Sequence, residues 1–269
     1  MTKILIIGSA SLDTLHISGQ THHTVGGAGL YTALAVAKAG CSATLLAPMP
    51  EPMPEPLQLA ANQISWIGPL IAPDQLAQLE IAHHGDGKAT LIGAAWGATE
   101  TLSSQALPTD LSGYFCVHVA ALPTAHAQLE FVQACRQRNA SRISVGTYAK
   151  IAFGETDTVR QLLERTDFFF MNENEARGLF GELNDLRGPD GSMWFITMGK
   201  EGAWLLRGSE QIKVESPAVT EVDPTGAGDT FCGVTLAGLA NGMALREAML
   251  NGCSLAAQTI QGIGPSRLY

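Results

Sequence analysis

A glycine-rich stretch near the C-terminus, Asp223–Phe231 (DPTGAGDTF), combines residue types that can hold an anion beside a carboxylate. Pro224 interrupts any continuous strand or helix here, and Gly226 and Gly228 permit backbone angles that other residues avoid. Residues 232–240 are apolar nearly all round, which predicts a buried helix. The glycines would then present free backbone N–H groups at a helix N-terminus, where a phosphate or a developing anion can bind.

A carboxylate, Asp229, falls in the first turn of that predicted helix. It is expected to lie beside the anion rather than on it. Because an ordinary aspartate has a pKa of about 4, Asp229 is expected to be ionised at neutral pH. An anion cradle next to a base is what phosphoryl transfer to a hydroxyl requires. The stretch therefore predicts a phosphotransferase.

The N-terminus opens with an apolar, β-branched run, Ile4–Ile7, which predicts a buried parallel strand. The turn at residues 8–13 then places polar groups at the carboxyl end of that strand, where ligands bind in open α/β sheets. Asp13 is either a turn residue or a ligand to a substrate hydroxyl. No dinucleotide-binding G-x-G-x-x-G pattern follows Gly8, which argues against a Rossmann-type oxidoreductase.

A double glycine, Gly26 and Gly27, precedes an alanine-rich helix predicted over Leu30–Ala39. The glycines either make a tight turn or let the backbone approach a ligand. Asn172 and Glu175 stand three residues apart where a predicted strand ends and a helix begins. They form either a helix cap or a site that holds a water on Mg²⁺. The loop at 197–202 follows a later strand and can line a nucleotide.

From residue 114 onward, strand and helix patterns alternate regularly. Expected strands lie at 4–7, 42–47, 115–119, 142–145, 168–171 and 193–197. This alternation predicts the α/β class, with a central, mostly parallel sheet covered by helices on both faces. Polar segments at about 14–25 and 80–102 predict two hairpins forming a small β-lid that would exclude water from the site. Prolines between Pro48 and Pro56 predict an irregular surface crossing.

The overall composition indicates which partners are not expected and in which cellular compartment the protein should lie. A formal net charge of −9 argues against nucleic acid or an anionic membrane as the main partner. Five cysteines, an odd number without a paired motif, predict buried thiols in a reducing compartment. The N-terminal apolar run is too short for a signal peptide, and no segment reaches membrane-spanning length. A cytoplasmic location is expected.

Four segments, in this order, resemble the ribokinase-like (phosphofructokinase-B, PfkB) family of carbohydrate and nucleoside kinases. They are Gly8–Asp13, Gly26-Gly27 with its helix, Asn172 with Glu175, and Asp223–Asp229. The last of these is highly specific. The resemblance implies a single domain over residues 1–269, a three-layer α/β sandwich with a β-lid, and ATP and Mg²⁺ as cofactors. It also allows a monovalent cation and a homodimer formed through the lid.

The resemblance implies a role for each matching residue. Asp229 would be the catalytic base, and the backbone of Gly226, Ala227 and Gly228 the anion hole. Asp13, Gly26 and Gly27 would face the acceptor, with Tyr31 beside them. Glu175 would act on Mg²⁺ through water. The nucleotide-binding residues would be Asn172, Thr197, Gly199, Thr225 and Asn251.

Two departures from the family pattern leave the acceptor open. Tyr31 stands where members acting on simple sugars often carry asparagine, and residues 146–148 (GTY) stand where an Asp-Pro-Asn type sequence is common. Tyr31 and Trp96 could stack on a nucleobase, or pack in the core and the lid. The acceptor determinants are expected within residues 10–31, 80–102 and around His118. The alternative function is a catalytically quiet metabolite-binding regulator, which would be marked by loss of Asp229 or the glycines; both are present.

Overall fold

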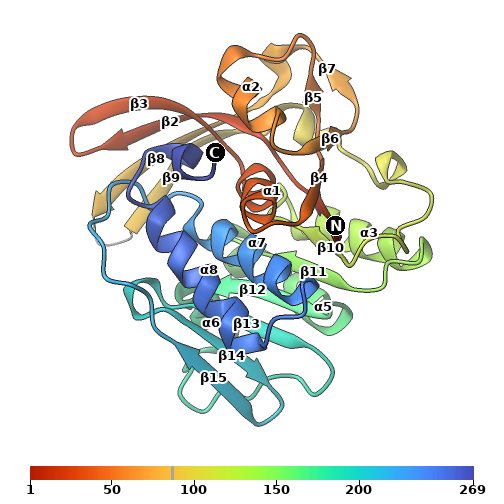
Figure 1. The fold of residues 1–269 in the computed structure, drawn as a ribbon, viewed down its shortest axis with the longest axis vertical. Coiled ribbons are helices and arrows are strands. Elements are labelled where there is room, and N and C mark those ends of the chain that lie inside the picture. Colours follow the sequence, from red (N-terminus) through yellow and green to blue (C-terminus); the bar gives the residue numbers. More distant parts are fainter. Residues whose placement is uncertain (86–87) are drawn as a thin grey trace.

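The largest feature of the computed structural model, which describes residues 1–85 and 88–269, is a nine-stranded sheet (Figure 1). Every neighbouring pair from β13 to β6 is parallel, and β14 and β15 extend the sheet with antiparallel pairs. Across the sheet the strands are β15 (Glu210–Val214), β14 (Ala203–Arg207), β13 (Met193–Thr197), β12 (Phe168–Asn172), β11 (Ile143–Gly146), β10 (Cys116–Val119), β1 (Lys3–Ile7), β4 (Ser42–Leu46) and β6 (Ser65–Ile67).

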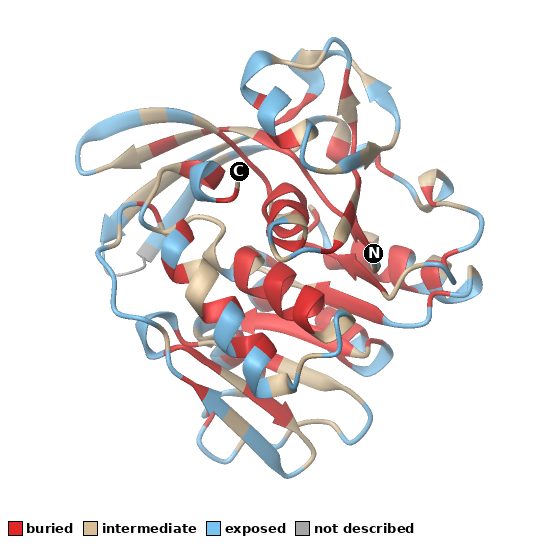
Figure 2. Cartoon of the chain, viewed as in Figure 1, coloured by how far each residue is buried: buried red, intermediate tan, exposed pale blue. Residues whose placement is uncertain are grey.

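Helices cover both faces of this sheet, which confirms the predicted α/β architecture. Because side chains alternate along a strand, Ile4 and Ile6 of β1 pack into one core, while Leu5 and Ile7 pack into the other. The first core includes residues of α1 (Ala28–Lys38), α2 (Glu55–Ala61), α7 (Ala227–Ala240) and α8 (Leu245–Thr259). The second includes residues of α3 (Ala125–Gln137), α4 (Ala149–Gly154), α5 (Thr156–Arg165) and α6 (Glu173–Phe180). Figure 2 shows how thoroughly the central elements are buried.

A second sheet of four strands lies beside the main one and is the expected β-lid. Its order is β3 (Gln20–Gly26), β2 (Ser11–Ile17), β8 (Ala77–Gly85) and β9 (Lys88–Ala95). Two antiparallel hairpins are joined by a parallel pairing of β2 with β8. The strands start earlier than the expected segments 14–25 and 80–102, and a 3-10 helix, η2 (Gly97–Thr101), follows β9 instead of further strand. The turn expected at 85–87 falls largely outside the described residues.

Two local patterns turned out differently. Of the two readings of Asp13, the turn is excluded, because pairing with β3 draws the residue into β2. The proline-rich segment is not wholly irregular either. It contains a short strand, β5 (Met49–Pro50), paired with β7 (Leu70–Ile71), and α2 begins at Glu55. A two-residue strand needs few N–H donors, and proline is well tolerated in the first turn of a helix.

The remaining short elements are 3-10 helices, and they mostly connect strands. They are η1 (Pro73–Gln75), η3 (Ser104–Ala106), η4 (Gly199–Glu201) and η5 (Gly264–Arg267). All five cysteines are free and buried, as predicted. Within the described ranges, no helix is long and apolar enough to cross a membrane.

Candidate active site

The glycine-rich loop ends where predicted, at the N-terminus of α7. Gly226 caps this helix in a left-handed conformation, with φ of +74°. A Cβ at this position would lie 2.3 Å from the Tyr31 ring, so both the backbone angle and the close packing require glycine. The Ala227 N–H donates to the Pro224 carbonyl oxygen at 3.3 Å. The freest amides of the loop are therefore those of Gly226 and Gly228.

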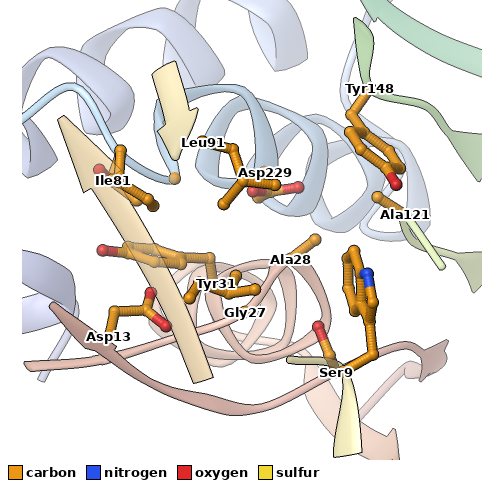
Figure 3. A pocket seen from close by; sticks show the side chains of 14 residues that line it. Ser9, Asp13, Gly27, Ala28, Tyr31, Ile81, Leu91, Ala121, Tyr148 and Asp229 are labelled. Carbon is orange, nitrogen blue, oxygen red and sulfur yellow. The ribbon is translucent and has the colours of Figure 1, made fainter. Parts of the chain in front are cut away.

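A cavity of about 160 Å³ opens where this loop meets the lid sheet, the start of α1 and the carboxyl end of β1 (Figure 3). Six of the predicted site residues line it: Asp13, Gly27, Tyr31, Thr225, Gly226 and Asp229. The others that line it are Ser9, Ala28, Leu79, Ile81, Leu91, Trp96, Ala121 and Tyr148. The structure thus brings residues from opposite ends of the chain to one small cavity.

Two carboxyl groups face this cavity, and neither is an ordinary aspartate. Asp13 is only 2% exposed, and its Oδ1 atom has no hydrogen-bond partner. Burial, assisted by the charge of Asp223, raises the pKa of Asp13 to about 7, although the nearby Ser11 hydroxyl opposes the shift. Burial likewise raises the pKa of Asp229 to about 7. This pKa lies well above the value of about 4 that was expected for Asp229.

Gly26 and Tyr31 support the site by packing. A Cβ at Gly26 would lie 1.9 Å from Asp13 Oδ2, so a side chain there would displace the carboxylate. Tyr31 is 1% exposed and its hydroxyl lacks a partner. Burial, followed by the charges of Asp223 and Asp13, raises the pKa of this phenol above its usual value. Its ring covers Gly226 and forms part of the cavity wall.

Asn172 and Glu175 form the helix cap that was one of the two readings of this pair. Glu175 Oε2 accepts from the Asn172 backbone N–H at 2.9 Å, and Asn172 Oδ1 accepts from the Glu175 N–H at 2.9 Å. Burial raises the pKa of Glu175 to about 8, and the charge of Asp229 adds to the shift. The cap therefore does not exclude the second reading. Two carboxyls that repel each other across a buried site fit a cation held through water.

The remaining predicted nucleotide-binding residues lie outside the cavity. Thr197 is the register partner of Asn172 in the neighbouring strand, so both stand at the carboxyl edge of the sheet. Gly199 follows with a φ of +56° and begins η4. Asn251 is exposed on α8, and its amide reaches Met243 Sδ at 3.4 Å. Thr197 and Gly199 therefore lie on β13 and at the start of the following η4, whereas Asn251 lies on the separate helix α8.

Several cavity residues were not among the predicted site residues. Ser9, Ala121 and Tyr148 follow β1, β10 and β11, and the rule that ligands bind beyond the carboxyl ends of strands could have found them. The Tyr148 and Trp96 rings lie 6.1 Å apart in a tilted arrangement. Ile81 and Leu91 fall within the segment 80–102 where acceptor determinants were expected, and Leu79 lies just before it. The pairing of β8 with β9 is the expected hairpin, but no local pattern reveals the pairing of β8 with β2.

His118 is buried in the core rather than at the cavity wall. Its Nδ1 lies 2.8 Å from Ser144 Oγ, and its ring packs edge-on against Phe170. Burial lowers the pKa of this imidazole to about 3, so it is uncharged. His118 itself is therefore not part of the cavity wall, although Ala121, three residues later, lines the cavity. Among residues that the structure describes, no group of three or more His, Cys, Asp or Glu side chains could hold a metal directly.

The chain is similar to known proteins in both sequence and fold. The chain is 26% identical to the cytidine kinase of Thermococcus kodakarensis over 274 residues, covering 98% of each protein. Its fold matches adenosine kinase from Sinorhizobium meliloti with a TM-score of 0.81 at 20% identity, covering 98% of this chain and 95% of that one. It also matches ribokinase from Cryptococcus neoformans var. grubii serotype A in complex with ADP, with a TM-score of 0.81 at 18% identity, covering 98% and 94%. The family model "pfkB family carbohydrate kinase" matches residues 1–268. The chain therefore belongs to the pfkB family of carbohydrate kinases.

Proposed function

We propose that this protein is an ATP-dependent kinase that transfers the γ-phosphoryl group to a hydroxyl of a nucleoside or a sugar. The observation that carries the proposal is the position of Asp229. This carboxyl lies in the first turn of α7, three residues after the left-handed Gly226, and opens into the same cavity as Asp13. A base, an anion-binding helix start and a polar acceptor side thus meet in one place.

In the proposed reaction, Asp229 accepts the proton of the acceptor hydroxyl, and the backbone N–H groups of Gly226 and Gly228 stabilise the charge on the transferred group. The amide of Ala227 contributes if its bond to Pro224 opens. Asp13 would accept a hydrogen bond from another hydroxyl of the acceptor, which would satisfy its unpartnered oxygen. Each role uses an atom that the structure leaves free or weakly bonded.

The magnitudes decide when the proton moves. A sugar hydroxyl has a pKa of about 16, close to that of water, while the pKa of Asp229 is raised to about 7. Full deprotonation before transfer would cost about 9 units, or about 12 kcal/mol at 1.36 kcal/mol per unit. A kinase turning over about 10 times per second has a total barrier of about 16 kcal/mol. Only about 4 kcal/mol would remain for the transfer itself, so Asp229 must receive the proton late, as the phosphoryl group arrives.

The nucleotide would lie along the carboxyl edge formed by Asn172 and Thr197, past Gly199 and Thr225 and toward Asn251. Glu175 would hold Mg²⁺ through water, and the ion would supply charge neutralisation on the phosphate oxygens. Bound there, a divalent cation would also relieve the repulsion between Glu175 and Asp229. We expect its binding to lower the pKa of both carboxyls.

The cavity wall favours a nucleoside over a simple sugar. Trp96 and Tyr148 present aromatic rings, and Leu79, Ile81 and Leu91 add apolar surface. A nucleobase gains from stacking and apolar contact, whereas a free sugar presents hydroxyls that need polar partners. Tyr31 is too deeply buried to be a stacking platform by itself. The 26% identity to a cytidine kinase points in the same direction.

The test is a screen of ADP production from ATP and Mg²⁺ over nucleosides, sugars and sugar phosphates, with a reaction lacking the acceptor as the blank. We expect a nucleoside to give the highest kcat/KM. Turnover restricted to sugars would overturn the choice of substrate class. ADP production no higher than the blank with every acceptor would overturn the kinase proposal and favour a regulator on the same fold.

A further inference from the structure

A histidine of the lid contacts the glycine-rich loop. His83 lies on β8, and its Nε2 atom is 3.2 Å from Thr225 Oγ1 and 3.5 Å from Asp223 Oδ1. The side chain is only 4% exposed, and its Nδ1 atom has no partner. A polar side chain of the lid is thus buried against the loop that precedes the proposed anion hole.

The partner of this histidine, Asp223, is itself a junction between two backbone segments. Its Oδ1 atom accepts from the Thr225 N–H at 2.9 Å, and its Oδ2 atom accepts from the Gly264 N–H at 2.7 Å. Asp223 is 1% exposed. The carboxylate therefore fixes the loop before Gly226 and ties it to η5, and His83 adds a third contact from the lid.

The strand that carries His83 also forms part of the cavity wall. Leu79 and Ile81, four and two residues earlier in β8, line the cavity that holds Asp229. An acceptor touching these side chains therefore touches the strand that bonds to the loop. Burial lowers the pKa of His83, although Asp223 and Glu221 oppose the shift and His84 adds to it. The Nε2 atom of His83 lies within hydrogen-bonding distance of Thr225 Oγ1 and beside Asp223 Oδ1.

We propose that His83 is a positioning residue that transmits lid closure over the acceptor to the anion-binding loop. When the lid lies as in this structure, His83 holds Thr225 and Asp223, and through them the start of α7 with Asp229. When the lid moves away, the loop loses this contact. This inference rests on the proposed function, because it assigns His83 a part in the timing of phosphoryl transfer.

The kinetic test compares His83→Ala with His83→Gln and with the neighbouring control His84→Ala. His84 is exposed and bonds to Thr90 of β9 instead. Losing one neutral hydrogen bond should lower kcat by about tenfold in His83→Ala, while the Kd for ATP measured without acceptor stays within about twofold. Glutamine, whose amide nitrogen reaches a similar place, should recover most of the loss. An unchanged kcat in His83→Ala, or an equal loss in His84→Ala, would overturn the proposal.

A second readout needs no turnover, so it separates this inference from the kinase proposal. Hydrogen exchange of the backbone across residues 221–228 and 262–268 should be about three- to tenfold faster in His83→Ala than in the wild type. The His84→Ala variant should match the wild type, and His83→Gln should lie near it. Equal exchange in all four proteins would overturn the positioning role, even if the ADP screen identifies an acceptor.

Discussion

Three carboxyl groups at the site carry raised pKa values: Asp13 and Asp229 at about 7, and Glu175 at about 8. The main cause at each is burial, which disfavours the charged form. Among groups that face the cavity, Asp13, Tyr31 and Tyr148 also have polar atoms without partners. An acceptor hydroxyl and a cation are the ligands that would satisfy these groups. These buried groups thus lower the folding stability of the protein without ligands, which is common at sites whose geometry is already formed before binding.

The raised pKa of Asp229 predicts the pH dependence of turnover. The base must be ionised, and its pKa is about 7, so kcat should fall about tenfold per pH unit below that value and level off above it. Mg²⁺ should shift this fall in kcat to lower pH, because a nearby cation favours the carboxylate form of Asp229. The measurement is kcat against pH at two Mg²⁺ concentrations.

The control for that profile is Asp13→Asn, which removes the other aspartate of similar pKa. Because Asp13 would act on acceptor binding, the variant should keep the fall of kcat at low pH, while its KM for the acceptor rises. A flat kcat between pH 5.5 and 8 in the wild type would show that Asp229 does not limit the reaction as proposed.

Among the secondary-structure elements, α7 and the loop before it show how the backbone and the packing restrict which residues are tolerated. Gly226 combines a φ of +74° with a Tyr31 ring 2.3 Å from any added Cβ. Gly228 is also in the helix start, but a Cβ there meets nothing within 4 Å. The two glycines belong to the same motif. The backbone angle and the packing require glycine at position 226, whereas neither the backbone angle nor the space around the Cβ requires it at position 228.

This difference predicts opposite effects on stability. Gly226→Ala should destabilise the fold by about 2 kcal/mol or more, from the left-handed backbone and the clash together, lowering Tm by about 4–8 °C. Gly228→Ala should leave Tm unchanged or raise it, because alanine favours a helix by about 1 kcal/mol. Thermal unfolding of both variants checks this, and equal Tm values would contradict the packing argument.

In the whole molecule, features set by neighbouring residues could be predicted from the sequence, whereas features set by pairing of distant strands could not. The glycine-rich loop, the buried strand β1 and the Asn172–Glu175 cap are local patterns, so they were found without a structure. The parallel pairing of Ser11 with Ala77 joins two distant hairpins, and no short-range pattern reveals it. Ile81 and His83 lie in the segment 80–102 where acceptor determinants were expected, but that pairing decides that they and Leu79 face the cavity and the glycine-rich loop. The pKa of Asp229 likewise follows from tertiary burial, which the sequence does not show.

A homodimer through the lid stays a prediction that the lid surface makes testable. Within the described sheet, β9 is an edge strand, and Ile92 on it is 53% exposed. Exposed edges with apolar side chains are common pairing surfaces. Ile92→Lys should shift sedimentation from dimer to monomer, while Leu59→Lys on α2, 60% exposed, should not. A wild type that sediments as a monomer at tens of micromolar would rule the dimer out.

The central claim is that Asp229 is the base for phosphoryl transfer. The most direct test is Asp229→Asn, measured for turnover with the acceptor identified by the screen and for ATP binding by titration. The account predicts a loss of kcat on the order of 10²–10⁴-fold with ATP affinity nearly unchanged, because the carboxylate acts on the hydroxyl and not on the nucleotide. Turnover within a few-fold of the wild type would contradict it.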